Sequence, residues 1–205
     1  MTAVQPANPA RKGLRKSDER RAQITAAALR CLQRDGYASL TARKVAEEAG
    51  VALGHMTYHF RDMAEVLSEA YRLASRQLLE QTGADMGRSP GTPRSQLSAF
   101  LGAGFTPDFL RRDYLRMRID FWSAALTATE IAATERELYD IYRARLSALL
   151  STMAPQADLP QTLLTTDAIM ALLDGLWLDW LRRGNQQAVA NGLAACLQLA
   201  DRLAA

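Results

Sequence analysis

Apolar side chains recur at intervals of three and four residues along almost the whole chain, which is the spacing of amphipathic α-helices. Ile24, Ala28, Cys31 and Leu32 form one such stripe, and no segment shows the strict apolar–polar alternation typical of strands. The pattern therefore predicts an all-α fold. About nine helices are expected, over residues 17–35, 41–49, 52–59, 62–82, 93–104, 107–128, 130–153, 161–183 and 186–203.

Glycine and proline residues set the expected limits of these helices. Gly36 and Gly50 end the first two, and Thr92-Pro93 and Thr106-Pro107 each place a capping residue before a proline. Proline is tolerated there because its missing N–H has no partner in a first turn. The Gly- and Pro-rich segment 83–93 is expected to be a loop within one domain.

Charge divides the chain unevenly. Residues 1–61 contain 11 Lys or Arg and 5 Asp or Glu, a net charge of +6, whereas residues 62–205 have a net charge of −3. A basic head on a mildly acidic body indicates that the head meets a polyanion, although a solubilising N-terminal tail explains the same numbers. We expect a flexible basic arm over 1–16, a small helical domain over 17–61 and a larger helical domain over 62–205.

Composition argues against several other classes of protein. No run reaches the roughly 18 apolar residues that a membrane-spanning helix needs, and residues 1–10 lack the apolar core of a secretory signal. Cys31 and Cys196 are far apart and form no metal-binding or redox spacing. The expectation is a cytoplasmic protein with no cofactor, no metal and no membrane partner.

Residues 41–60 have the features of a helix-turn-helix. A short helix begins at Thr41, ends at Gly50 and is followed by another short helix, in which Met56 and Phe60 face inward. Tyr58 is left on the outer side of that second helix, which has the dimensions that a DNA major groove admits. The periodicity alone is also seen in other small helical bundles.

A longer string of residues surrounds this motif. It comprises Ile24-Thr25-Ala26-Ala27-Ala28, Gly36-Tyr37, Leu40-Thr41, Val45-Ala46-Glu47-Glu48-Ala49-Gly50-Val51, Gly54, Tyr58-His59-Phe60, Asp62 and Leu67. With these residues, the stretch from Ala22 to Leu67 resembles the DNA-binding region of the TetR family of repressors. The chain also has that family's usual size and all-helical plan.

The resemblance implies which residues contact DNA. In such repressors the start of the second helix and the recognition helix read the major groove, and the end of the recognition helix contacts phosphates. The matching positions here are Thr41, Arg43, Leu53, Gly54, His55, Tyr58 and His59. A glycine at 54 lets the backbone approach DNA closely. The basic residues of the arm, Arg11, Lys12, Arg15 and Lys16, would add salt-sensitive contacts.

Two departures and several plainer interpretations weigh against parts of this assignment. Ala52 replaces the family's usual Ser or Thr cap, and Met63 replaces a usual Lys. Arg43 with Lys44 also fits a solvated helix face, and Tyr58 also fits a partly buried core position. His55 and His59 have the spacing of a zinc helix, but no third ligand is evident.

The body has a second resemblance. Asp120-Phe121-Trp122 and Asp174-Gly175-Leu176-Trp177-Leu178 resemble the BetI-type branch of TetR repressors, whose members control choline and glycine-betaine genes. Carboxylates beside aromatic rings suit a cationic effector, although an apolar or other ligand is favoured somewhat over it and Asp120 also fits an ion pair with Arg116. The candidate ligand residues are Tyr71, Tyr114, Met117, Asp120, Phe121, Asp174 and Trp177.

The resemblance implies a homodimer joined through the last two long helices, bound to palindromic double-stranded operator DNA and released by a small-molecule effector. Trp177 and Trp180 also fit core or dimer positions. A helical protein that binds small molecules without specific DNA binding is the alternative. We do not expect an enzyme, since no paired carboxylates, Cys/His pair or phosphate loop is evident.

Overall fold

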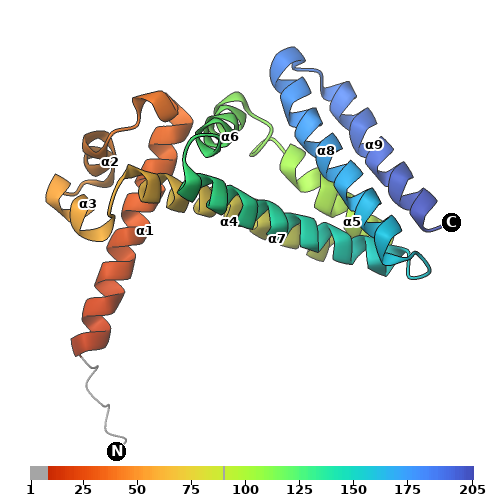
Figure 1. Cartoon of the computed structure of the whole chain (residues 1–205), viewed down its shortest axis with the longest axis horizontal. Coiled ribbons are helices and arrows are strands. Elements are labelled where there is room, and N and C mark those ends of the chain that lie inside the picture. The colour runs from red at the N-terminus through yellow and green to blue at the C-terminus, as the bar shows by residue number, and fades with distance from the viewer. Residues whose placement is uncertain (1–8, 90) are drawn as a thin grey trace, which may run out of the picture. The chain divides into compact units, whose positions relative to one another are not determined.

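A computed structural model describes residues 9–89 and 91–205, with side chains from residue 16 onward. Within these ranges the chain forms nine α-helices and two short 3₁₀ turns, and it divides into two compact units, 1–73 and 74–205 (Figure 1). Helix α4, Met63–Arg88, belongs to both units because the division falls after Leu73. The predicted all-α fold is confirmed, while the division lies inside α4, after the predicted boundary at residue 61.

The first unit is a small helical head. It contains α1 (Pro9–Asp35), the 3₁₀ turn η1 (Tyr37–Ser39), α2 (Ala42–Ala49), α3 (Leu53–His59) and the first turns of α4. Helix α1 packs against both α2 and α3. The core is formed by inward apolar residues at helical spacing, among them Ile24, Ala28, Leu32, Val45, Ala49, Met56, Phe60, Val66 and Leu67.

The second unit is a larger helical body. Beyond the end of α4 it contains α5 (Pro93–Gly102), η2 (Ala103–Phe105), α6 (Arg112–Ala125), α7 (Thr129–Met153), α8 (Leu159–Arg183) and α9 (Gln186–Leu203). Helices α8 and α9 run side by side, and α8 also packs against α6 and α7 (Figure 1). A Cβ at Gly192 of α9 would collide with the Leu176 side chain of α8, so glycine allows the two helices to approach closely.

Helix α1 begins earlier than predicted. Residues 9–16, expected to belong to the arm, are helical from Pro9, because proline fits a first turn and the Arg, Lys and Leu residues that follow are good helix formers. The side chains of Arg11, Lys12 and Arg15 lie outside the described residues, as do residues 1–8 of the predicted arm.

The predicted loop over 83–93 is wrong in its first half, since α4 continues to Arg88. Gly83 and Gly87 cost about 1 kcal/mol each relative to alanine, and side-chain contacts one turn apart stabilise this part of α4. Gln81 Nε2 donates to Asp85 Oδ1 at 2.9 Å, and Arg88 pairs with the same carboxylate.

The predicted helix start at Thr106-Pro107 is also wrong. The Thr106 carbonyl accepts from the N–H groups of Phe109, at 3.0 Å, and Leu110, at 2.8 Å, so the segment closes as a turn. Phe109 and Leu110 are buried by this turn, and α6 begins only at Arg112 after the extended residue Arg111. Local burial of two large apolar side chains therefore overrides the cap-then-proline signal.

Across the described ranges, no helix is long and apolar enough to cross a membrane.

Candidate nucleic-acid interface and ligand cavity

The turn between α2 and α3 is fixed by its end residues. The Lys44 N–H donates to Oγ1 of Thr41 at 3.3 Å, which caps α2. Gly50 ends α2 in the left-handed conformation, with φ 64°, and its N–H bonds back to the last turn. Ala52 precedes α3 and gives no side-chain cap, as its substitution for Ser or Thr predicts. Helix α3 is therefore held mainly by its buried residues Met56 and Phe60.

The predicted DNA-contact residues lie on the exposed side of the head. Tyr58 is 81% exposed and Leu53 49% exposed, while His59 is half-buried with its ring 5.0 Å from that of Tyr58 in edge-on contact. Tyr58 is therefore not a core residue. Nothing lies within 4 Å of a Cβ built on Gly54, so no neighbour in this chain requires glycine there. The remaining predicted residues, Thr41, Arg43 and His55, are exposed.

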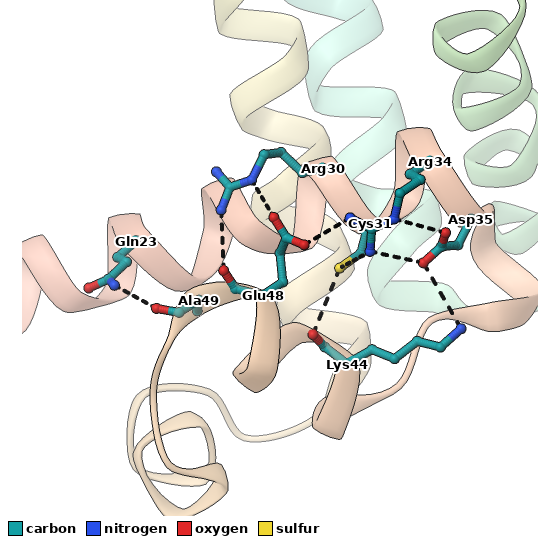
Figure 2. Close-up of polar contacts among 8 residues, drawn as sticks. All are labelled: Gln23, Arg30, Cys31, Arg34, Asp35, Lys44, Glu48 and Ala49. Atoms are coloured by element: carbon teal, nitrogen blue, oxygen red, sulfur yellow. Dashed lines mark hydrogen bonds and ion pairs between the residues drawn. The ribbon is translucent and has the colours of Figure 1, made fainter.

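Helix α2 is held on α1 by a polar network that the sequence analysis missed (Figure 2). Arg30 Nε and Arg34 Nη1 donate to the two carboxylate oxygens of Glu48, at 2.7 and 2.8 Å. These hydrogen bonds lower the pKa of Glu48. Gln23 Nε2 donates to the Ala49 carbonyl at 2.6 Å, at the end of α2. The spacing of two arginines one turn apart on α1 is the only sequence signal for this contact.

A second missed residue, Arg21 of α1, holds the end of the recognition helix. Its Nη1 donates to the His59 carbonyl at 2.6 Å, and its Nη2 donates to Glu65 of α4 at 2.8 Å. The guanidinium also lies 4.3 Å from the centre of the Phe60 ring. The pKa of Glu65 is lowered, first by a hydrogen bond from the Arg61 N–H and then by Arg21. Arg21 thereby fixes where α3 ends relative to α1.

The body contains an open cavity of about 500 Å³ between α6, α7 and α8. Its residues are aromatic, apolar and charged: Trp122, Ala125, Leu126, Ala132, Glu135, Arg136, Tyr139 and Asp174. Burial raises the pKa of Asp174 to about 6, against the opposing attraction of Arg118. Burial also raises the pKa of Glu135. Two carboxyl groups in one cavity are thus partly withdrawn from water.

Arg118 of α6 lies among the aromatic residues near this cavity. Its guanidinium carbon is 5.0 Å from the ring centre of Trp177 and 5.7 Å from that of Trp122. Its Nη1 is 3.5 Å from Oγ of Ser75, a buried residue of α4. Trp177 is itself fixed, because its Nε1 donates to the Gly104 carbonyl at 3.0 Å.

Only some of the predicted ligand residues lie at or beside the cavity. Asp174 lines it, Trp177 contacts Arg118 beside it, and Asp120 is half-buried. The others, Tyr71, Tyr114, Met117 and Phe121, are core residues. Trp122, Glu135 and Tyr139 line the cavity but are not among the predicted ligand residues, although the spacing of Glu135 and Tyr139 places them one turn apart. Among the described side chains, no three or more His, Cys, Asp or Glu are grouped to hold a metal.

Two different protein families match the N-terminal and the C-terminal parts of the chain. Residues 24–70 match the family "Bacterial regulatory proteins, tetR family", and residues 93–205 match "BetI-type transcriptional repressor, C-terminal". The HTH-type transcriptional regulator BetI of Stenotrophomonas maltophilia is 27% identical over 167 residues, which cover 82% of this chain and 84% of that protein.

Solved structures share the fold. A Pseudomonas aeruginosa PAO1 protein classed as a transcriptional regulator superposes with a TM-score of 0.78 and 29% identity, over 91% of each chain. A Saccharomonospora viridis protein of the same class, solved in complex with choline, superposes with a TM-score of 0.74 and 21% identity, over 90% of this chain and 96% of the other. The matched families and relatives are transcriptional regulators, not enzymes. This chain belongs to the TetR family of bacterial transcriptional regulators, with a body of the BetI repressor type.

Proposed function

We propose that this regulator binds a palindromic operator as a homodimer and releases it when an organic cation enters the cavity between α6, α7 and α8. The residues that line this cavity support the assignment of an organic cation as the effector. Asp174 and Glu135 supply half-buried carboxylates, while Trp122 and Tyr139 supply aromatic faces. These are the groups that bind quaternary ammonium ions. The choline complex of the Saccharomonospora viridis protein, which shares the fold, makes choline the first probe.

The proposed DNA contacts follow from exposure and polarity. A phenol that is 81% exposed at Tyr58 has no role in the core and can donate to a phosphate. Arg43 is exposed on α2, where a guanidinium can read a guanine in the major groove. The proposed set remains Thr41, Arg43, Leu53, Gly54, His55, Tyr58 and His59.

The proposed dimer interface lies on α8 and α9. Leu164 is 73% exposed and Leu172 38% exposed on α8, and Ala168 and Gly175 extend the same exposed stripe. Apolar and small residues along one helix face are suited to packing against a second copy around a two-fold axis. Two copies related in this way would place two recognition helices on a symmetric operator.

Helix α4 is the proposed route of the signal. It is one continuous helix that begins in the head unit and contributes Ser75 to the body unit. An effector can shift the DNA-binding equilibrium only if it binds the two conformations with different affinity. If effector binding changes the surroundings of α4, the two conformations of the protein bind the effector with different affinity.

Calorimetric titration of the dimer with choline and with its uncharged isostere, 3,3-dimethyl-1-butanol, tests the effector class. Choline is expected to bind at pH 8 and the isostere to bind at least about ten-fold more weakly, because only the ammonium interacts with the carboxylates and rings. Equal binding of both compounds would show an apolar site. Binding of neither would remove the cation assignment while leaving the DNA assignment in place.

A further inference from the structure

The cavity between α6, α7 and α8 lies near a cationic side chain of the protein itself, that of Arg118. The Arg118 guanidinium lies within 6 Å of two aromatic ring centres, at 5.0 Å for Trp177 and 5.7 Å for Trp122. This is the range in which a cation is attracted by a ring face. Trp122 also lines the cavity, so the same ring faces both Arg118 and any ligand that enters.

The carboxyl groups of the cavity respond to the same arginine. Arg118 acts to lower the pKa of Asp174 and of Glu135, against the burial that raises both. The positive charge of Arg118 therefore acts on both carboxyl groups and favours their ionised forms. Arg136 lines the cavity itself, but its side chain is exposed on α7.

Arg118 also reaches the helix proposed to carry the signal. Its Nη1 lies 3.5 Å from Oγ of Ser75 on α4, and Ser75 is buried within the body unit. One side chain therefore contacts the aromatic wall of the cavity and α4.

We propose that Arg118 is a built-in competitor of the effector: an organic cation displaces its guanidinium from the ring of Trp122, and this displacement breaks its contact with Ser75 of α4. The inference rests on the proposed cationic effector and adds the residue that senses it. Arg118 is then a positioning residue that couples the cavity to α4. A permanent structural counterion would differ, since its loss would destabilise the body and weaken ligand binding.

The test is choline binding by R118M, measured at pH 8 by tryptophan fluorescence and by calorimetry. Removal of the competing guanidinium is expected to tighten choline binding on the order of ten-fold. The same variant is expected to bind DNA but to lose most of the choline-induced release, because the link to Ser75 is absent. Tighter binding together with weaker release is a result that a purely structural role does not produce.

Two matched variants separate competition from general charge. R116M removes a positive charge from the exposed side of the same helix and is expected to leave choline affinity within about two-fold of wild type. R136M removes the exposed charge of the cavity rim and is expected to tighten binding less than R118M does. An equal increase in choline affinity in R136M and R118M would overturn the proposal, because the loss of any nearby positive charge would then explain the tighter binding.

Two further variants keep the test decisive if R118M folds poorly. R118K retains the charge but loses the planar contact with the rings, so it should tighten choline binding by a smaller factor. S75A should leave choline bound but reduce its effect on DNA. If wild type binds choline and neither Arg118 variant binds it more tightly, the competitor role is wrong and the cation site stands. If neither wild type nor R118M binds choline, the cationic effector and the competitor role both fail, and the DNA assignment stands.

Discussion

At the scale of single residues, the proposed binding of a cation in the cavity depends on the ionisation of Asp174. Burial holds the pKa of this carboxyl at about 6, so it is ionised above that pH and increasingly neutral below it. The groups that act on it are Arg118 from α6 and Glu135 and Tyr139 from α7, and Arg136 of α7 lines the same cavity. The pKa of Glu135 is raised as well, so both carboxylates lose charge in the same direction as the pH falls.

Choline affinity is accordingly expected to depend on pH. A cation favours the ionised carboxylates, so affinity should be constant near pH 8 and should fall as the pH passes below about 6. D174N should weaken choline binding on the order of ten-fold at pH 8 and should flatten most of this dependence. Calorimetry at pH 5.5 and 8 checks both effects. Unchanged affinity across this range would remove Asp174 from the site.

Tyr58 provides the sharpest residue-scale prediction for the head. Because it is 81% exposed, Y58A should leave the thermal unfolding of the protein almost unchanged. Loss of a phosphate contact should weaken operator binding by roughly five- to ten-fold, corresponding to about 1 kcal/mol. Y58F tests the hydroxyl separately. Operator affinity equal to wild type in both variants would count against the contact.

At the scale of elements, the helix-turn-helix could be predicted from its own residues because its signals are local. Thr41 caps, Gly50 stops and Met56 faces inward within 16 residues of one another, and the structure places each as expected. The extension of α4 past Gly83 could not be predicted in this way. There, side-chain contacts such as that between Gln81 and Asp85 stabilise the helix across a glycine, which is only a weak signal for a helix end.

Two glycines of this element should respond in opposite ways to alanine. G50A should destabilise the head by about 1 kcal/mol, because Gly50 has φ 64°. G54A has open space around its Cβ and should stabilise α3 by about 0.5–1 kcal/mol in chemical denaturation. If the backbone at 54 meets DNA, G54A should nevertheless bind operator less tightly than wild type. Retained operator affinity in G54A would place DNA away from this turn.

At the scale of the whole molecule, the sequence could indicate a helical body but not the cavity. Arg118, Glu135 and Asp174 belong to three helices, and periodicity shows only which face of each helix is apolar. It therefore selected the core residues Tyr114, Met117 and Phe121 as ligand residues, because core and cavity positions share one helical spacing.

The proposed dimer is tested by placing a charge in the exposed stripe of α8. Leu164 is 73% exposed in the single chain, so L164R should barely affect folding of the protomer. Two arginines facing each other across a two-fold axis should repel and shift the protein to monomer in light scattering after gel filtration. A full-size dimer in L164R would move the interface elsewhere. R145M, a change at an exposed position of α7, serves as the control.

The most direct test of the account is fluorescence anisotropy of the full-length protein on labelled duplex from upstream of its own gene, titrated with choline at pH 8 in the presence of excess unrelated DNA. Binding is expected to be tight and salt-dependent, to survive the competitor, and to be reversed by choline but not by 3,3-dimethyl-1-butanol. Specific binding that choline leaves unchanged at concentrations saturating the cavity would contradict it.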